Sequence, residues 1–127
     1  MTLQQRIEAS ETRLFKAVFP GTTNHYDTLF GGTAMQLMDE AAFIAATRFT
    51  RKRVVTVSSD RIDFSMPIPG GTIIELVARV ESTGRTSLKI RVEIYVEEMY
   101  SFSRQLAVTG IFSFVAIDEN KRPVSIA

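Results

Sequence analysis

The sequence predicts an α+β protein in which one antiparallel β-sheet wraps around a single long helix. Residues from Thr33 to about Phe49 form the one long stretch of helical composition, and neither Gly nor Pro interrupts it. After Arg53 the hydrophobic pattern changes to a period of two and keeps it almost to the end of the chain. Four or five strands with one apolar face therefore have one apolar helix available to cover that face.

Two short elements are expected ahead of the helix. Thr2 to Ser10 is polar and rich in helix formers, which predicts a short surface helix or a loose arm. Thr12 to Phe19 alternates enough to form a strand, which Pro20-Gly21 ends. A chain of 127 residues is the size of one domain. We therefore expect a single domain over residues 1–127, with residues 1–11 as an N-terminal arm or short helix.

The strands after the helix show regular alternation. Val54 to Met66 predicts one long strand or two. The next strand carries apolar and charged residues on opposite faces: Ile74, Leu76, Ala78 and Val80 against Glu75, Arg79 and Glu81. Beyond a turn at Gly84, Leu88 to Val96 repeats this pattern. The last strand is expected to place four apolar residues on one face: Leu106, Val108, Phe112 and Phe114. The pattern indicates a sheet with one dry face and one wet face.

The long helix is apolar nearly all the way round, so we expect other structure to cover it on all sides. One sheet cannot hide every side of a helix. Some apolar surface should remain for a second subunit, and the sequence predicts at least a dimer.

Composition excludes several classes of protein. The formal net charge is +1, and Arg51-Lys52-Arg53 is the one run of positive charge, so a nucleic-acid partner is not expected. The run is more typical of a solvated turn than of a phosphate site. The chain has no cysteine, which excludes disulfides, thiol catalysis and thiolate metal ligands, and no cluster of other residues predicts a metal site. Met1 to Glu11 contains no apolar run, and no stretch is long enough to cross a bilayer. We therefore expect a cytoplasmic protein without membrane insertion.

Gly31 and Gly32 stand where a loop meets the start of the long helix. Without side chains they let a ligand approach the backbone, and the first N–H groups of a helix have no acceptor within the helix. Those donors, aided by the helix dipole, could stabilise an oxyanion. The alternative is that the two glycines only permit a tight turn.

Asp39 lies about two turns into the predicted helix. Its neighbours on the same stripe are apolar or glycine except for Gln36: Gly32, Met35, Ala42, Phe43 and Ala46. A carboxylate there is costly unless it is hydrogen-bonded or its pKa is raised, and such a group can serve as a general base. The alternative is a solvated or salt-bridged helix residue. Glu40 falls on a polar stripe and is not a candidate.

Asn24 and His25 lie in the polar loop before the helix. Asn24 could orient water or donate a hydrogen bond to a carbonyl, although Asn is common in turns. His25, the one histidine, is an acid–base candidate on general grounds, but a lone loop histidine is more often exposed.

Together these segments resemble the signature of the hotdog acyl-CoA thioesterases. The resemblance rests on residues 24–32, NHYDTLFGG, followed by Met38-Asp39-Glu40. Further similarities are residues 53–57, Asp63-Phe64 before Pro67, and the turn at Gly84-Arg85-Thr86-Ser87. The resemblance extends over nearly the whole chain, from about Leu14 to Val124.

The resemblance implies the hotdog fold and hydrolysis of an acyl-CoA thioester to free acid and coenzyme A, without a cofactor. It also implies a homo-oligomer, in which dimers often assemble into hexamers as trimers of dimers. Asn24 and Asp39 match the family's catalytic pair, contributed by different protomers, with Asp39 as general base or nucleophile. The amides of Gly31 and Gly32 would hold the oxyanion.

The resemblance further implies a substrate-binding set in two places. The strand at Thr56-Val57, with Phe64 further along, and the turn at Arg85-Thr86-Ser87 resemble elements that contact the substrate.

Asp27 departs from the family pattern, because many relatives have Gly there. A second carboxylate could raise the pKa of Asp39 or repel anionic substrates, or it could be a turn residue that faces solvent. Two other functions stay open. A non-catalytic acyl-CoA sensor would use the same groove, and a dehydratase of the same fold would rely on a histidine as its base.

Overall fold

The computed structural model describes residues 1–127, apart from the side chain of residue 22. Its elements are α1 (Leu3–Ser10), β1 (Thr12–Val18), the 3-10 helix η1 (Pro20–Thr22), α2 (Gly31–Thr50), β2 (Arg53–Phe64), β3 (Thr72–Thr83), β4 (Ser87–Glu98) and β5 (Arg104–Ile117). The expected order of elements is confirmed.

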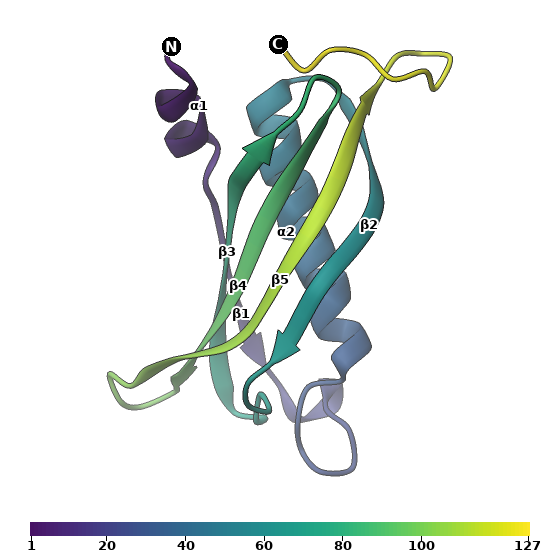
Figure 1. The fold of residues 1–127 in the computed structure, drawn as a ribbon. Coiled ribbons are helices and arrows are strands. Elements are labelled where there is room, and N and C mark those ends of the chain that lie inside the picture. Colours follow the sequence, from purple (N-terminus) through teal and green to yellow (C-terminus); the bar gives the residue numbers. More distant parts are fainter.

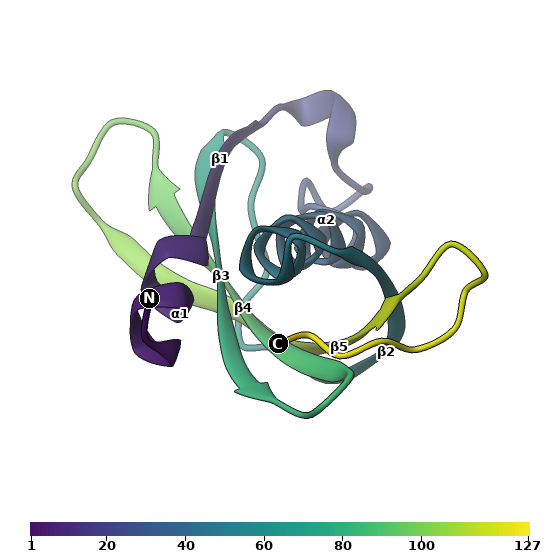
Figure 2. The same ribbon diagram turned by 90° about the horizontal axis from the view of Figure 1, so that it is seen from above.

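The five strands form one antiparallel sheet in the order β1-β3-β4-β5-β2. The sheet curls around α2, as Figures 1 and 2 show. Small side chains on α2 let the helix approach the sheet closely, and Ala41, Ala42, Ala45 and Ala46 are fully buried. The predicted wrapping of a sheet around one long helix is therefore confirmed.

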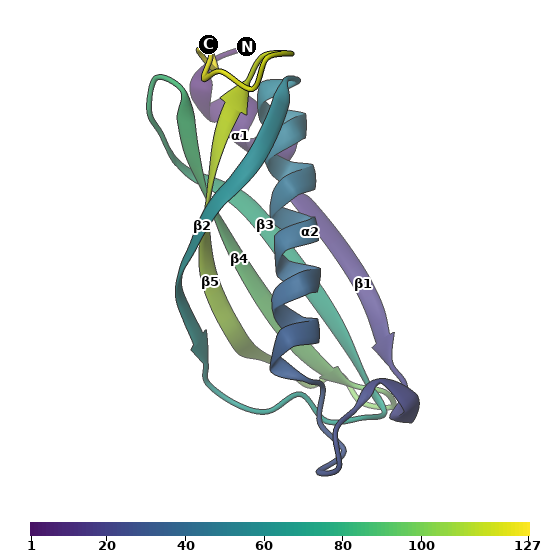
Figure 3. The same ribbon diagram turned by 90° about the vertical axis from the view of Figure 1, so that its right-hand side faces the viewer.

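One flank of α2 is not covered by its own chain. Met35 and Phe43 are 37% and 46% exposed, and Figure 2, which shows α2 end-on, shows that the curled sheet surrounds only part of the helix. Figure 3 shows α2 from the side, with β2 and β1 on either side of it. The curled sheet is too narrow to close around the helix, in agreement with the expectation that one sheet cannot hide every side of it. Apolar helix surface remains at the flank, as expected for a protein that binds a second subunit. Neither α1 nor α2, the two α-helices of the described residues, is long and apolar enough to cross a membrane.

The last strand, β5, departs from the expected alternation at Ala107. Ile94 of β4 pairs with Val108, but the next residue, Tyr95, pairs with Leu106, so β5 has one extra residue at this point. This irregularity turns Ala107 inward and leaves Leu106 39% exposed on the outer face. The prediction that Leu106 shares the buried face of Val108 and Phe112 is wrong for this reason.

Strand β2 forms the second edge of the sheet and is irregular in two places. Its pairing with β5 shifts between Thr56 and Ser58 and again between Asp60 and Asp63. Within the second shift Arg61 has a φ of 51°, which lies in the left-handed region, and Ile62 turns toward the core. Gly110 on β5 receives this side chain, because a Cβ at position 110 would collide with Ile62 Cδ1.

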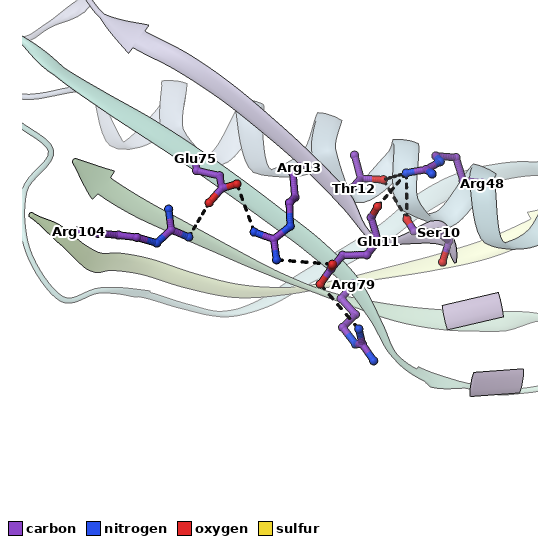
Figure 4. Close-up of polar contacts among 8 residues, drawn as sticks. All are labelled: Ser10, Glu11, Thr12, Arg13, Arg48, Glu75, Arg79 and Arg104. Atoms are coloured by element: carbon purple, nitrogen blue, oxygen red, sulfur yellow. Dashed lines mark hydrogen bonds and ion pairs between the residues drawn. The ribbon is translucent and has the colours of Figure 1, made fainter. Parts of the chain in front are cut away.

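The N-terminal helix α1 is tied to α2 by Arg48. The start of α1 is closed by a capping box between Thr2 and Gln5. At the other end of α1 the guanidinium of Arg48 donates to the carbonyl oxygen of Ala9 at 2.9 Å. It also donates to the carbonyl oxygen of Glu11 at 2.9 Å and to Thr12 Oγ1 at 3.0 Å (Figure 4). Arg48 therefore satisfies backbone acceptors that the end of a helix leaves open.

A row of ion pairs crosses the outer face of the sheet, centred on Glu75 (Figure 4). Glu75 is 3% exposed and binds Arg13 at 3.3 Å and Arg104 at 2.5 Å. Burial acts to lower the pKa of Arg104, but hydrogen bonds to Glu75 and Glu97 and their charges raise it above its ordinary value. The buried carboxylate is thus matched by two permanent cations, and we assign this cluster a structural role.

Candidate active site

The N-terminus of α2 presents backbone donors to solvent. Phe30 precedes the helix and makes no side-chain cap, and the first turn closes with the bond from Ala34 N to Phe30 O at 3.0 Å. The amides of Gly31 and Gly32 therefore have no acceptor within the helix. Both glycines are exposed, and the dipole of the 20-residue helix makes this end attractive to negative charge.

Neither glycine is required by the backbone or by packing within the protomer. Both lie in the helix, and among the glycines of the described chain only Gly71 has a positive φ. A Cβ at Gly32 would meet no atom within 4 Å, and one at Gly31 would lie 3.8 Å from Phe64 Cζ. Alanine would form a better helix at both positions. The tight-turn interpretation therefore does not account for them.

Asp39 is held by a hydroxyl from β2. Its Oδ1 accepts a hydrogen bond from Thr56 Oγ1 at 2.9 Å. Asp39 is partly exposed, whereas the preceding residue, Met38, is fully buried. Within the described residues Oδ2 forms no hydrogen bond or ion pair, so one carboxylate oxygen is oriented and the other is free to act.

Asn24 organises its own loop and keeps its amide group free. Its Oδ1 accepts hydrogen bonds from Tyr26 N at 2.9 Å, Thr28 N at 3.1 Å and Thr28 Oγ1 at 3.0 Å. Three donors around one atom identify that atom as the oxygen. Nδ2 donates to no acceptor among the described residues. Asn24 can therefore donate to a ligand but cannot accept from one without opening the loop.

The conformation and contacts of the loop around Asn24 explain the presence of an aspartate at position 27, where the family pattern has glycine. Asp27 has a φ of 58°, where glycine is favoured and aspartate is tolerated. Its Oδ1 accepts from Thr23 Oγ1 at 3.2 Å, and its carbonyl oxygen accepts from Gly70 N at 2.8 Å. These contacts support the interpretation as an exposed turn residue. His25, also exposed, stacks on Tyr26 with ring centroids 3.9 Å apart.

The predicted substrate-binding residues fall into two groups. Thr56 binds Asp39, Val57 is 56% exposed beside it, and Phe64 is 50% exposed near Gly31. The turn at residues 85–87 lies at the other end of the molecule, beside the C-terminal end of α2 (Figure 1). There Arg85 O accepts from Ile126 N, and Thr86 O accepts from Ala116 N, each at 2.9 Å. One protomer therefore does not bring this turn to the start of α2.

The proposed oxyanion donors and the proposed base are also far apart along α2. Gly31 and Asp39 are separated by eight positions, which corresponds to about 12 Å of helix. Asn24 forms no contact with Asp39 among the described hydrogen bonds. One carbonyl carbon cannot touch both the Gly31 amide and the Asp39 carboxylate of one protomer.

Comparison with known protein families shows to which superfamily this chain belongs. Residues 26–102 match the thioesterase superfamily. The chain belongs to this superfamily. The curled sheet around α2 is the hotdog fold that the sequence predicts, and solved acyl-CoA hydrolases share it.

Individual members of the superfamily are similar over most of the chain. An acyl-CoA thioester hydrolase of Zymomonas mobilis, itself uncharacterised, is 39% identical over 118 residues, which cover 93% of this chain and 79% of the relative. The acyl-CoA hydrolase of Staphylococcus aureus, solved with butyryl coenzyme A, coenzyme A and coenzyme A disulfide, has a TM-score of 0.89 and 36% identity. That match covers 94% of this chain and 73% of the other. A hexameric apo acyl-CoA thioesterase has a TM-score of 0.90 and 34% identity, covering 94% and 76%.

In this member of the thioesterase superfamily, sequence reasoning missed the bond between Thr56 and Asp39. Thr56 was expected only among the substrate contacts. The alternation of β2 contained a signal, because Thr56 lies two positions after the buried Val54 and so faces α2. Among the described residues no group of three or more His, Cys, Asp or Glu side chains could hold a metal ion.

Proposed function

We propose that this chain hydrolyses acyl-CoA thioesters to a free acid and coenzyme A. The observation that carries the proposal is the Asp39 carboxylate, oriented by Thr56 Oγ1 at 2.9 Å with its second oxygen free. A positioned carboxylate can remove a proton from water as the water attacks the thioester carbon, or it can attack that carbon itself. In both routes the C–S bond breaks, the thiolate of coenzyme A leaves and takes up a proton, and water supplies the hydroxyl of the acid.

The remaining groups stabilise the carbonyl oxygen as it becomes negative. The free amides of Gly31 and Gly32 would donate to this oxygen, and Asn24 Nδ2 would donate to it or to the water. Structures similar to this one include variants of the S. aureus enzyme in which an asparagine, an aspartate or a threonine is replaced by alanine. Those three positions have the same order and spacing as Asn24, Asp39 and Thr56, which supports this assignment. The chemistry uses no cofactor.

The site is built from two copies of the chain. Because Gly31 and Asp39 lie about 12 Å apart on one helix, we infer that Asp39 of one protomer works with Asn24 and Gly31 of its partner. The edge strand β2 carries Thr56 and pairs on one side only, with β5, and its Val55 is 41% exposed. A second copy that pairs with this edge would bring its own groups to Asp39.

We further propose that such dimers assemble into a hexamer, because similar enzymes are hexameric. A cytoplasmic location accords with an acyl-CoA substrate.

The function is tested by release of free thiol from a panel of acyl-CoAs, from acetyl to palmitoyl, with purified protein. We expect thiol release with at least one member of the panel and a dependence on acyl length. Saturable binding of acyl-CoA without thiol release would overturn the hydrolase assignment and favour an acyl-CoA sensor. Loss of water from a hydroxyacyl substrate, or addition of water to an enoyl substrate, without release of thiol would favour a dehydratase.

Replacing Gly32 by alanine should raise stability and lower activity together. Alanine is favoured over glycine in a helix by up to about 1 kcal/mol, and the Cβ meets nothing within the protomer. The same Cβ would stand in the space that a thioester must enter to reach the amides, so we expect kcat/KM to fall by about tenfold or more. Thermal unfolding and thiol release measure the two effects.

Gly21→Ala is the matched control, since a Cβ there also meets nothing within 4 Å. It should leave kcat/KM unchanged. Full activity in Gly32→Ala would show that the start of α2 does not bind the substrate.

A further inference from the structure

The loop that carries Asn24 has a counterpart at the other end of the molecule. Residues 24–28 precede α2, and residues 118–122 follow β5 (Figure 1). In both loops Oδ1 of the first residue accepts from the backbone N–H groups of the third and fifth residues, at 2.8–3.1 Å. In both, the N–H of the fourth residue also donates to the carbonyl oxygen of the first at 3.0 Å. The two loops share this pattern, so it does not explain the side chains in which they differ.

The first residue shows what the loop itself requires. In the second loop this residue is Asp118, so a carboxylate oxygen closes the loop as well as an amide oxygen does. The Nδ2 group of Asn24 has no part in closing the first loop, because the hydrogen bonds are made by Oδ1. The loop alone therefore gives no reason for an asparagine at position 24, which supports the role of Nδ2 as a donor to the substrate or the water.

The fourth residue has a left-handed backbone in both loops, with a φ of 58° at Asp27 and 62° at Lys121. Lys121 forms no side-chain hydrogen bond or ion pair with a described residue, so this conformation needs no partner for the side chain. Asp27 differs, because its Oδ1 accepts from Thr23 Oγ1 at 3.2 Å and its carboxylate lies against Gly70. A Cβ at position 70 would collide with Oδ1 and lie 3.1 Å from Cγ. The packing of Asp27 on Gly70 is therefore an addition to the loop and not a condition for forming it.

Gly70 belongs to a segment that joins the loop to the sheet. Its N–H donates to Asp27 O, and the N–H of Gly71 donates to the carbonyl oxygen of Val18 at the end of β1, each at 2.8 Å. Gly70 has no positive φ, so its backbone would accept a side chain, and the carboxylate of Asp27 fills the space that this side chain would take. The loop is thus fixed to the sheet by a backbone hydrogen bond and by the contact between Asp27 and Gly70.

We propose that Asp27 is a positioning residue for hydrolysis, whose carboxylate packs against Gly70 and keeps Asn24 Nδ2 directed at the substrate. This inference rests on the proposed function, because Asn24 must act on the thioester or on the water. Asp27 itself does not touch the substrate. A glycine at position 27 would form the same loop with more freedom, and small displacements of a catalytic group lower the rate of the chemical step.

The first test removes the contact without straining the loop. In Asp27→Gly we expect kcat for acyl-CoA hydrolysis to fall about three- to tenfold, the equivalent of one hydrogen bond, while KM stays within about twofold. The fold is not threatened, since glycine is favoured at a φ of 58°. Asp27→Asn tolerates the same conformation and presents an oxygen to Thr23, so it should restore most of the wild-type kcat.

Lys121→Gly is the matched control, because it removes the side chain from the same position of the second loop. It should leave kcat and KM unchanged, with a shift of the unfolding temperature similar to that of Asp27→Gly. An equal loss of kcat in both glycine variants would overturn the proposal. So would a rise of kcat/KM in both Asp27→Gly and Asp27→Asn, because the carboxylate would then repel the substrate.

A second test reaches the same contact from its other side. Gly70→Ala should displace the carboxylate and lower kcat by about the same factor as Asp27→Gly. The three atoms nearest to a Cβ at position 70 all belong to Asp27, so Gly70→Ala should cause no further loss in a protein that already has Asp27→Gly. Losses that multiply in the double variant would show that the two residues act independently, against the proposal.

Hydrogen exchange followed by mass spectrometry separates this proposal from the proposed function. The amides of Asn24, Asp27 and Leu29 are hydrogen-bonded, and we expect their peptide to exchange faster in Asp27→Gly and in Gly70→Ala but not in Asp27→Asn. A protein with this exchange pattern that hydrolyses no acyl-CoA would refute the proposed function and leave the contact established. An active protein whose exchange and kcat are the same in all three variants would refute the positioning role alone.

Discussion

Replacing Asp39 by alanine is expected to lower kcat for acyl-CoA hydrolysis by about 10²–10⁴-fold, the range for loss of a general base. The carboxylate is the one group in the described site with an oriented oxygen, bound to Thr56, and a second oxygen free for water or for the thioester carbon. Asp39 is only partly buried, so the protein should still fold. Thiol release under saturating acyl-CoA measures the effect, and circular dichroism and light scattering confirm the fold and the assembly.

Two companion variants give this prediction its control. Asp39→Asn keeps the shape and the hydrogen bond from Thr56 but cannot accept a proton, so it should be nearly as inactive as Asp39→Ala. Thr56→Val removes the hydroxyl that orients Oδ1 and leaves the carboxylate in place. We expect a smaller loss there, of about tenfold, in line with one hydrogen bond. Activity within twofold of the wild type in Asp39→Ala would remove Asp39 from the mechanism.

Mixing two inactive variants is expected to restore activity. Asp39→Ala and Asn24→Ala should each be inactive alone. When protomers of the two exchange, each mixed dimer contains one site with both Asp39 and Asn24 and one site with neither. Random exchange at equal concentrations should recover about a quarter of the wild-type activity, because each two-fold interface creates two sites. Partial unfolding and joint refolding of the two proteins, followed by thiol release, measures the recovery.

If each site were contained in one protomer, the mixture would stay inactive, because no protomer in it has both Asp39 and Asn24. Differently tagged variants, purified through both tags, establish that mixed dimers have formed. Mixed dimers without restored activity would contradict the inference that two copies share the site. Each variant refolded alone is the baseline.

Much of the fold could be predicted from the sequence because its patterns are long and regular. The helix was expected from Thr33 to Phe49, and α2 runs from Gly31 to Thr50. The predicted faces of the strands were wrong where one extra residue breaks the alternation. Nothing in the composition of β5 marks Ala107 as an extra residue, since the irregularity depends on how β4 pairs with β5. The face of Leu106 could therefore not be read from alternation alone.

The candidate site was harder to predict because its residues act through contacts distant in sequence. Asn24 and Asp39 were candidates from the sequence itself, but their assignment as a catalytic pair came from a resemblance, and these roles stay predictions. That Asn24 can only donate follows from three local hydrogen bonds to its Oδ1. That Asp39 is held by Thr56 requires α2 and β2 to be placed side by side. Which residues of a second copy face Asp39 depends on an interface that periodicity does not describe.

The irregular edge at β2 has a consequence for how the protein avoids aggregation. An open strand invites further strands to add without limit, and a chain with two open edges could grow into a filament. Here the second half of β2 is interrupted between Asp60 and Asp63, with Arg61 in a left-handed conformation. The half that begins at Arg53 has a register shift between Thr56 and Ser58 but no residue of positive φ, so we expect a new strand to pair there. A two-fold pairing uses that half of both copies at once. The other edge, β1, carries charges at Arg13 and Lys16 that oppose strand addition. We therefore expect the sheet to grow by one copy and then stop.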